Sequence, residues 1–308
     1  MPELPEVETV CRGLNQLTLD LEIVGGEVLH ASTIAHPLSA ADFLAGLKGK
    51  AIAQWSRRGK YLLADLYRPG EGERREGKGK EEGLATAGSS NLQPAYQTSP
   101  SRLAVHLRMT GQLLWLHPSD PLQKHTRVRL FLVGDRELRF VDQRTFGQMW
   151  WVPPGTEPSK IVTGLQQLGP EPFSQEFSVE YFASKLQNRQ RPIKSALLDQ
   201  TVVAGLGNIY ADEALFLAGV RSTIPCSELT PEATERLHRA IVQVLQSAIA
   251  AGGTTFSNFL NVYGVNGNYG GVAWVYNRAG QPCRTCGTPI QRLKLAGRST
   301  HFCPECQQ

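Results

Sequence analysis

The chain has 308 residues, more than one domain usually holds, and its 41% hydrophobic and 19% charged residues exclude an intrinsically disordered protein. No apolar run approaches the ~20 residues of a membrane-spanning helix, and the first residues lack the basic and apolar regions of a secretory signal, so we expect a cytosolic protein. The net charge of +4 is modest, but between positions 183 and 308 twelve Lys and Arg residues outnumber seven Asp and Glu residues, which is typical of a region that binds a polyanion.

After one helix, the first half of the chain is predicted to be β structure. The opening segment PEVETVCRGLNQLT has helical spacing, with Pro5 near its start and Glu6 and Glu8 in the first turn, where carboxylates suit the helix dipole. Short alternating or β-branched segments then follow: LEIVGGEVL, AIAQWSR, KYLLADLY, RLAVHLRM, GQLLWLH, RVRLFLV, RELRFVD and GQMWWV. We therefore expect residues 1–152 to form a β-sandwich or barrel that carries an N-terminal helix.

Residues 69–102 interrupt this β pattern. The segment is rich in Gly, Ser, Pro and charges of both signs and has no periodicity, so we predict a disordered insertion at the tip of a hairpin. Such an insertion between paired strands costs little stability.

The second half is predicted to be helical. After a linker at 153–170, apolar spacings of three and four residues run through SVEYFASKLQ, PIKSALLDQ, NIYADEALFLAG and TPEATERLHRAIVQVLQSAIAAG. Thr230 before Pro231 is typical of a helix N-cap. We expect a helical domain at 171–275 and a short, basic, cysteine-bearing unit at 276–308, so the whole chain is an α+β multidomain protein.

Four of the six cysteines form two CxxC pairs separated by sixteen residues: Cys283, Cys286, Cys303 and Cys306. Two such pairs close a tetrahedral zinc site with no open position, so one structural Zn²⁺ is predicted. A redox-active pair is the alternative, which the ribbon spacing and the basic surroundings disfavour. Cys11 and Cys226 stand alone and are expected to be buried small hydrophobic residues.

The N-terminus combines an amine with carboxylates. Initiator methionine is normally removed before proline, and an α-amino group has a pKa of about 7.7 to 8.0, so the secondary amine of Pro2 would be nucleophilic at neutral pH. It can attack an aldehyde-level carbon such as C1′ of a deoxyribose, with Glu3 as proton donor and Lys60 in RRGKYLL as a second basic group. The competing interpretation is a stable chain end followed by the solvated start of a helix, and Glu8 is expected to be such a solvated residue.

Two further features suit contact with DNA. The Gly-rich turn in VAGLGNIYADE allows close approach of a backbone, with Asn208 capping the next helix and the N-terminal amides of that helix available to phosphate. Alternatively, such a turn merely joins two helices. In HLRMTG and DQRTFG, Met109 and Phe146 would ordinarily be core residues, whereas beside DNA two apolar wedges and an arginine can fill the space left by an extruded base.

Taken together, MPELPEVET, RRGKYLL, HLRMTG, DQRTFG, GLGNIYADEALF and CRTCGTPI…GRSTHFCPEC resemble the formamidopyrimidine-DNA glycosylase family of bacterial base-excision repair, in family order and over nearly the whole chain. Leu4 matches the oxidised-purine branch, since endonuclease VIII relatives typically begin PEGPE. The resemblance implies a monomeric bifunctional glycosylase and AP lyase. Such an enzyme flips 8-oxoguanine and formamidopyrimidines out of double-stranded DNA, removes them and nicks the strand by β,δ-elimination, without a nucleotide cofactor or a membrane. The alternatives are an endonuclease VIII-like oxidised-pyrimidine glycosylase and a catalytically silent zinc-finger DNA-binding protein.

The resemblance also implies catalytic roles, motif by motif. Pro2 is the Schiff-base nucleophile, Glu3 the general acid and Glu6 a supporting carboxylate. Lys60 contacts phosphate and assists elimination, and Arg298 in the finger clamps the phosphates beside the flipped nucleotide.

The DNA-binding roles that it implies fall on both halves of the chain. Met109, Arg144 and Phe146 fill the vacated stack, with Arg144 facing the orphan cytosine. Glu213 faces the lesion pocket, residues 258–276 form a lesion-capping loop, and 171–275 is a helix-two-turn-helix domain. The remaining DNA-binding residues are His106, His125, Arg189, Lys194 and Asn208.

The sequence departs from the family pattern in three places. These are the insertion at 69–102, Gln143 where proline is common, and Arg189 where lysine is common. The residues within these motifs resemble those of cyanobacterial or plastid-type members of the family. We therefore expect a bacterial cytoplasmic protein associated with the nucleoid, with a plastid origin as the alternative.

Overall fold

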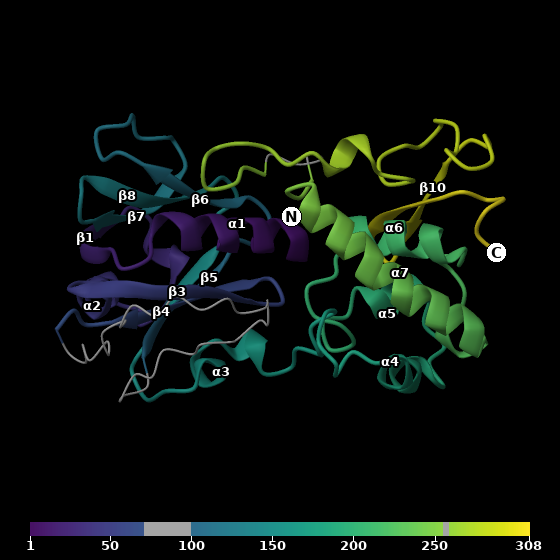
Figure 1. Ribbon diagram of the computed structural model, residues 1–308, viewed down its shortest axis with the longest axis horizontal. Helices are drawn as coiled ribbons and strands as arrows, with labels where there is room; N and C mark the ends of the chain where they lie inside the picture. Colours follow the sequence, from purple (N-terminus) through teal and green to yellow (C-terminus); the bar gives the residue numbers. More distant parts are fainter. Residues whose placement is uncertain (71–99, 255–258) are drawn as a thin grey trace, which may run out of the picture.

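The computed structural model describes residues 1–70, 100–254 and 259–308. Almost all of the predicted insertion at 69–102 therefore lies outside the described residues, as does the first residue of the predicted loop at 258–276. A β half and a helical half lie side by side, and the N-terminus lies where the two halves meet (Figure 1). Among the described residues, no helix is both long enough and apolar enough to cross a membrane.

The β half contains nine strands, counted over the described residues, that are hydrogen-bonded into one sheet. In sheet order they are β2 (Ile34–His36), β9 (Gln148–Val152), β5 (Ser101–His106), β4 (Tyr61–Tyr67), β3 (Lys50–Arg58), β1 (Glu22–Val28), β7 (Thr126–Leu132), β8 (Arg136–Asp142) and β6 (Gly111–Leu116). Between β1 and β3 only Glu22–Ala51 and Ile23–Lys50 are paired. The sheet folds over at this junction into two layers, as a sandwich does (Figure 1). All eight predicted strands are present, whereas β2 and the helix α2 (Ala40–Leu47) were not predicted.

Helix α1 (Leu4–Leu17) crosses the β half and buries one face in its core. Val7, Val10 and Leu14 are fully buried and pack in one cluster with residues from both layers of the sheet, among them Leu62 and Val128. The spacing of three and four residues that predicted the helix also makes this apolar stripe. Because α1 begins at Leu4, its burial fixes the preceding residues at the boundary between the two halves.

The helical half contains α4 (Val179–Leu186), α5 (Ile193–Leu197), α6 (Asn208–Ala218) and α7 (Pro231–Ala250), whereas the short helix α3 (Pro158–Ile161) lies against the β half (Figure 1). The hydroxyl of Thr230 accepts a hydrogen bond from the backbone N–H of Ala233, so the predicted N-cap of α7 is confirmed. Nearly every residue of α6 is buried, which explains why its sequence has no polar face. The N-cap of α6 is Gly207, and the expected cap, Asn208, is instead the first residue of the helix.

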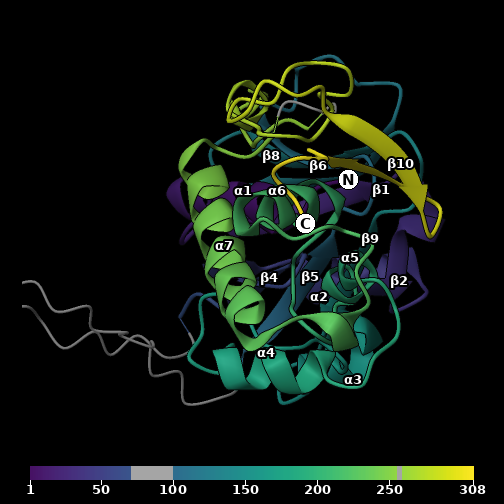
Figure 2. The same ribbon diagram turned by 90° about the vertical axis from the view of Figure 1, so that its right-hand side faces the viewer.

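The last segment forms a hairpin of β10 (Gln291–Leu295) and β11 (Arg298–Phe302) that lies against α5 and α6 (Figure 2). Its backbone is held by side chains of the helical half. Lys194 Nζ donates to Ser299 O at 2.8 Å, and Asn208 Nδ2 donates to the same oxygen at 3.1 Å. Asp212 Oδ2 accepts from His301 N at 2.9 Å, so the position of the hairpin is set by both helices.

Glu171 ties the β half to the helical half. Its carboxylate accepts hydrogen bonds from Arg57 Nη1 at 2.6 Å, Arg58 Nη1 at 3.0 Å and Gly59 N at 2.6 Å. Arg57 also donates to Glu8 Oε2 at 3.0 Å, so Glu8 is ion-paired and the expectation of a solvated residue was wrong. The turn between β3 and β4 is thereby fixed to α1 and to the chain that enters the helical half.

Replacing Glu171 with alanine should destabilise the protein by about 1–3 kcal/mol, because the N–H of Gly59 and two guanidinium groups lose their acceptor. Urea denaturation measures the change. Glu235→Ala is the control, since Glu235 is 52% exposed and pairs with Arg239 at 3.6 Å. Such surface pairs contribute about 0.5 kcal/mol or less. Equal losses in the two variants would show that Glu171 does not tie the halves together.

Candidate active site and DNA-binding surface

The carboxylate of Glu3 is bound by the first amides of α6. Glu3 is 2% exposed, and its two oxygens accept from Ile209 N at 3.0 Å and Tyr210 N at 3.4 Å. We expected these amides to bind phosphate, but in the structure they bind this side chain of the same protein. A Cβ on Gly207 would lie 2.2 Å from Glu3 Cδ, so the glycine before α6 is needed for the carboxylate to approach.

Glu3 and Lys60 perturb each other in opposite directions. Burial raises the pKa of Glu3, while the nearby Lys60 and the two amides oppose that rise. Burial lowers the pKa of Lys60, which is 7% exposed at the start of β4, and the negative charge of Glu3 opposes this fall. A carboxyl that keeps its proton to higher pH beside an amine that releases one more easily is the arrangement of an acid and base pair.

Glu6 is fully buried and supports the residues around it. Its Oε2 accepts from Glu3 N at 2.7 Å, and its Oε1 accepts from Tyr210 Oη at 2.5 Å and from Thr254 N at 2.8 Å. Burial, together with repulsion from Glu3, raises the pKa of Glu6 to about 7. Glu6 thus connects the backbone of Glu3 to α6 and to Thr254 in the chain beyond α7.

A cavity of about 310 Å³ lies beside the buried Pro2. It is lined by Met1, Pro2, Met109, Thr110, Gly111, Gln112 and Phe259. Phe259 belongs to the segment expected to cap a lesion, and in that same segment Val262 O accepts from Trp115 N of β6 at 2.9 Å. The segment therefore passes from the helical half to the β half beside this cavity (Figure 1).

Arg298 is brought to the same place from the other end of the chain. It is exposed at the first position of β11, and its charge contributes to lowering the pKa of both Lys60 and Lys194. The structure thus assembles Pro2, Glu3, Glu6, Lys60 and Arg298 around one site. Burial of α1 and docking of the β10–β11 hairpin account for this convergence.

Met109, Arg144 and Phe146 lie exposed on two neighbouring turns. Met109 is 36% exposed and Phe146 is 51% exposed, so neither is the core residue that its type would suggest. The guanidinium carbon of Arg144 lies 4.8 Å from the centre of the Phe146 ring, which keeps the two side chains together. Because Met109 also lines the cavity beside Pro2, the exposed turns and the cavity form one continuous surface.

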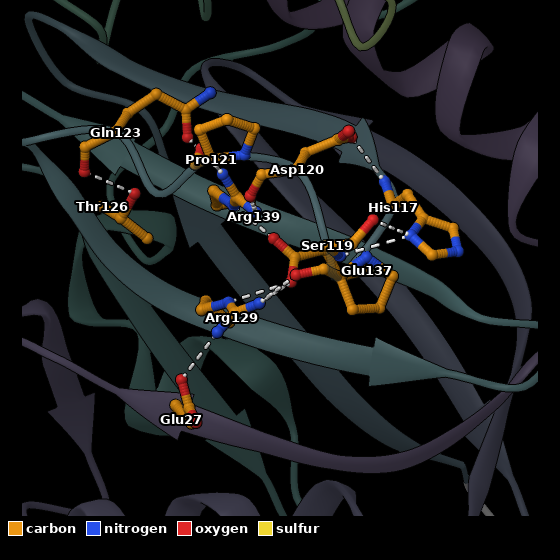
Figure 3. Close-up of polar contacts among 11 residues, drawn as sticks. Glu27, His117, Ser119, Asp120, Pro121, Gln123, Thr126, Arg129, Glu137 and Arg139 are labelled. Atoms are coloured by element: carbon orange, nitrogen blue, oxygen red, sulfur yellow. Dashed lines mark hydrogen bonds and ion pairs between the residues drawn. The ribbon is translucent and has the colours of Figure 1, made fainter.

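Buried charges hold the loop that leads to His125 (Figure 3). Arg139 donates to Asp120 O, Pro121 O and Gln123 Oε1, and Arg129 donates to Pro118 O. Glu137 is fully buried and pairs with both arginines, and Glu27 also pairs with Arg129, so two carboxylates balance the two guanidinium groups. His125 itself is half-exposed at the end of this loop, directly before β7.

Two residues expected to bind DNA have other partners. Lys194 is 1% exposed, and its ammonium group contacts Ser299 O, Thr300 Oγ1 and Asp212 Oδ1 at 2.8, 2.9 and 2.6 Å. Two of these contacts are hydrogen bonds to the finger and the third is an ion pair with α6, so Lys194 fixes the finger to that helix. His106 is buried and accepts from Arg108 N through Nδ1. Burial and the charge of Arg108 lower its pKa to about 3, so the imidazole is neutral near pH 7.

Glu213, which was expected to face the lesion pocket, contacts the end of the segment expected to cap a lesion. It is fully buried, and its oxygens accept from Trp274 N, Val275 N and Tyr276 N at 2.8 to 2.9 Å. Glu213 therefore anchors the chain that leads into the cysteine-bearing unit. Arg189 is half-exposed and 4.0 Å from Asp199, a position that leaves it open to a ligand.

The four expected metal ligands come together. The Sγ atoms of Cys283, Cys286, Cys303 and Cys306 all lie within 4.8 Å of one another. Backbone N–H groups of Thr285 and Cys306 point at the sulfurs of Cys283 and Cys303, as occurs around thiolates that bind metal. This donor set fits one tetrahedral Zn²⁺. Cys11 and Cys226 are buried and separate from the cluster, as expected.

Three residues that organise the site were not singled out from the sequence: Tyr210, Asp212 and Glu171. Tyr210 and Asp212 are polar residues inside a helix that is apolar on every side. That pattern was a usable signal, because buried polar side chains require partners. Glu171 has no such signal, since its partners are distant in sequence.

Three family models cover most of the chain. Residues 1–149 match the formamidopyrimidine-DNA glycosylase N-terminal domain, 168–259 match the H2TH domain of the same family, and 280–308 match a zinc finger found in FPG and IleRS. The formamidopyrimidine-DNA glycosylase of Trichodesmium erythraeum is 64% identical over 317 residues, covering 100% of both chains. That of Nostoc punctiforme is 62% identical and covers 100% of this chain and 96% of its own.

Solved structures agree with these matches. Lactococcus lactis Fpg in complex with DNA that contains an abasic site superposes with a TM-score of 0.82 at 32% identity, over 99% of each chain. Other complexes of the same bacterial protein contain Fapy-dG or an oxidised pyrimidine in the DNA. The matches extend over both halves, the finger and the residues of the site. The chain therefore belongs to the formamidopyrimidine-DNA glycosylase family.

Proposed function

We propose that the protein is a bifunctional DNA glycosylase and AP lyase that removes oxidised purines from duplex DNA. The observation that carries the proposal is the buried Glu3 carboxyl, held by the first amides of α6 next to Pro2 and Lys60. A protein that only binds DNA needs none of these groups. The cavity beside Pro2 is large enough for a flipped base, which supports the assignment to base excision.

The roles of the catalytic residues follow from this arrangement. After removal of Met1, the amine of Pro2 attacks C1′ of the damaged nucleotide, and the C1′–N bond to the base breaks as the pair of electrons leaves with the base. Glu3 supplies the proton to the sugar or the leaving base, because burial keeps it protonated to higher pH than a free glutamate. The nitrogen of Pro2 then loses its proton, and its lone pair breaks the C1′–O4′ bond as O4′ takes up a proton. This step opens the sugar ring and gives a cationic iminium, and Lys60 would assist the eliminations that break the strand on both sides.

DNA binding is assigned to residues at the site and on the surface around it. Arg298 and Lys60 would bind the phosphates of the flipped nucleotide, and His125, Arg189 and Asn208 phosphates farther along the strand. Met109, Arg144 and Phe146 would occupy the space left by the flipped base. Since one chain supplies every group of the site, we propose that the protein acts as a monomer.

Bound Zn²⁺ would supply structural stability to the finger rather than chemistry, since four cysteines leave it no open position. We propose the division of the chain as 1–152, with an insertion at 69–102, then a linker at 153–170, a DNA-binding domain at 171–275 with a lesion-capping loop at 258–276, and the finger at 276–308. A substrate in chromosomal DNA places the protein at the nucleoid.

A glycosylase for oxidised pyrimidines is the second candidate. One observation favours it: Lactococcus lactis Fpg, which matches this chain with a TM-score of 0.82, has been solved with DNA containing an oxidised pyrimidine. Both candidates use the same Pro2 chemistry, so only the lesion distinguishes them.

Borohydride trapping tests the function. We expect a covalent adduct at Pro2 with a duplex that carries 8-oxoguanine opposite cytosine, and much less with adenine opposite or with an oxidised pyrimidine. Glu3→Gln should lower excision by about 10²–10⁴-fold, because the amide has no proton to give. Glu235→Gln is the control, because Glu235 is exposed on α7 and pairs there with Arg239, and this variant should leave excision near the level of the original protein. An absent adduct with every lesion, after Met1 removal is confirmed by mass spectrometry, would contradict the enzyme assignment.

Removal of zinc should weaken DNA binding without melting the β half. A chelator unfolds the finger and releases Arg298 from the site, so the affinity for a lesion duplex falls, as measured by fluorescence anisotropy. Cys303→Ser should lose the metal, whereas Cys226→Ser should retain it by atomic absorption, since Cys226 is buried apart from the cluster. Unchanged DNA affinity in the zinc-free protein would show that Arg298 does not hold DNA.

The raised pKa of Glu6 predicts a specific pH dependence of stability. The folded protein binds a proton at Glu6 up to about pH 7, whereas a free glutamate releases it near 4.5. Protonated Glu6 therefore contributes fully to the free energy of unfolding below about pH 4.5. This contribution is lost as the pH rises from 4.5 to about 7, and the loss is about 3 kcal/mol at most. Thermal melts of Glu6→Gln should lack this decline. A parallel decline in the variant would assign the effect to other groups.

A further inference from the structure

The three loops that present exposed residues around the cavity meet at one buried side chain. Asp142 is the last residue of β8 and is 1% exposed. One loop carries Met109, the second ends at His125, and the third carries Arg144 and Phe146. Asp142 contacts all three loops, through its carboxylate and through its backbone.

The carboxylate joins the first and third loops. Its Oδ1 accepts hydrogen bonds from Thr110 Oγ1 and from Arg144 N at 3.2 Å, and its Oδ2 accepts from Gly147 N at 2.7 Å. The N–H of Arg144 also approaches Thr110 Oγ1 at 3.0 Å, so the two turns share a single hydrogen-bond network. Thr110 directly follows Met109, and Arg144 and Gly147 bracket Phe146. One carboxylate therefore sets the distance between the apolar wedges.

The backbone of Asp142 fixes the remaining loop. Its N–H donates to His125 O at 2.9 Å, and its carbonyl accepts from Arg127 Nε at 2.8 Å. The loop that leads to His125 is held at its other end by Arg139 and Arg129 (Figure 3). Asp142 thus determines where this loop joins the other two.

The third loop has little freedom apart from this contact. Thr145 has φ +57°, a left-handed conformation that a side chain disfavours unless its surroundings hold it. A Cβ on Gly147 would lie 2.4 Å from Phe140 Cζ and 3.0 Å from Asp142 Oδ2, so the turn is closed tightly onto the carboxylate. Loss of the acceptor would let the turn relax and would move Arg144 and Phe146 away from Met109.

We propose that Asp142 is the positioning residue that holds Met109, Arg144 and Phe146 in one arrangement and thereby sets the selectivity for the base opposite the lesion. This inference rests on the proposed function, in which those three residues fill the vacated stack. Arginine distinguishes bases by paired hydrogen bonds that tolerate little displacement, so its backbone must be fixed. Asp142 acts on the DNA only through the three loops that it contacts and takes no part in the chemistry at Pro2.

Asp142→Asn tests the inference. The amide keeps one oxygen that accepts hydrogen bonds, but its NH₂ group now faces an N–H or O–H donor that formerly bonded to the carboxylate. Two donors then face each other, so one contact of the network becomes repulsive. Thr110→Val removes the hydroxyl alone and serves as a milder second variant. Asp65→Asn is the matched control, because Asp65 on β4 pairs with Arg102 and Gln54 and contacts none of the three loops.

Three measurements distinguish a role of Asp142 in positioning the loops from a general role in stabilising the domain. The first is the ratio of single-turnover excision rates for 8-oxoguanine opposite cytosine and opposite adenine. The second is the fluorescence change of 2-aminopurine placed next to the orphan base, which reports the filling of the stack. The third is borohydride trapping on a single-stranded oligonucleotide with a preformed abasic site, where no opposite strand has to be filled.

In Asp142→Asn we expect the excision ratio to fall by about tenfold and the 2-aminopurine signal to shrink, while single-stranded trapping stays within about twofold of the original protein. Thr110→Val should shift the ratio in the same direction by less, and Asp65→Asn should not shift it. An unchanged ratio and signal in Asp142→Asn would overturn the role. So would equal losses in duplex excision and in single-stranded trapping, which would indicate general damage to the domain. If the original protein formed no adduct on any substrate, the proposed function itself would fail, and this role with it.

Discussion

The site depends on a carboxylate at the start of the chain that caps a helix about two hundred residues later. The first amides of α6 have no partner within the helix, and Glu3 satisfies two of them from the other half of the molecule. This contact holds Pro2 against the helical half, and Gly207 leaves the space for it. Without it, the N-terminal residues would be an unsupported chain end.

The same contact explains the chemistry of Glu3. Burial favours the neutral form, whereas the charge of Lys60 and the hydrogen bonds from the amides favour the ionised form. The balance leaves the pKa of Glu3 raised, beside a buried Lys60 whose pKa is lowered. A proton can therefore move within a small group of residues that water reaches poorly. Glu6 and Tyr210 extend this group to Thr254 in the chain beyond α7. These contacts connect Glu3 to the segment that leads to the cavity.

Buried polar residues also decide where the exposed residues lie. Lys194 and Asp212 hold the finger so that Arg298 reaches the site, and Glu213 anchors the chain entering the finger. Arg139 and Glu137 hold the loop before His125, and Asp142 joins the turns of Met109 and Arg144. In each case a buried side chain fixes a segment whose exposed residues we propose to contact the DNA. Such residues are difficult to recognise in a sequence, because the residue type alone does not show whether a charged side chain is buried or exposed.

The sequence by itself determined the helices and strands and the residues available for metal binding and catalysis. Periodicity identified α1, eight strands and the main helices, and the spacing of Cys283, Cys286, Cys303 and Cys306 determined a four-cysteine metal site, because these signals are local. The motifs also brought Pro2, Glu3 and Lys60 into one hypothesis. Only the tertiary structure decided which polar residues face a ligand and which face the protein. Lys194, His106 and Glu213 were expected at the DNA or in the lesion pocket, and the structure shows that each is buried with partners inside the protein. For Lys194 and Glu213 the physical reason is that these partners come from segments far away in sequence, and no local pattern records whether a charged side chain has a partner in the protein or is left for DNA.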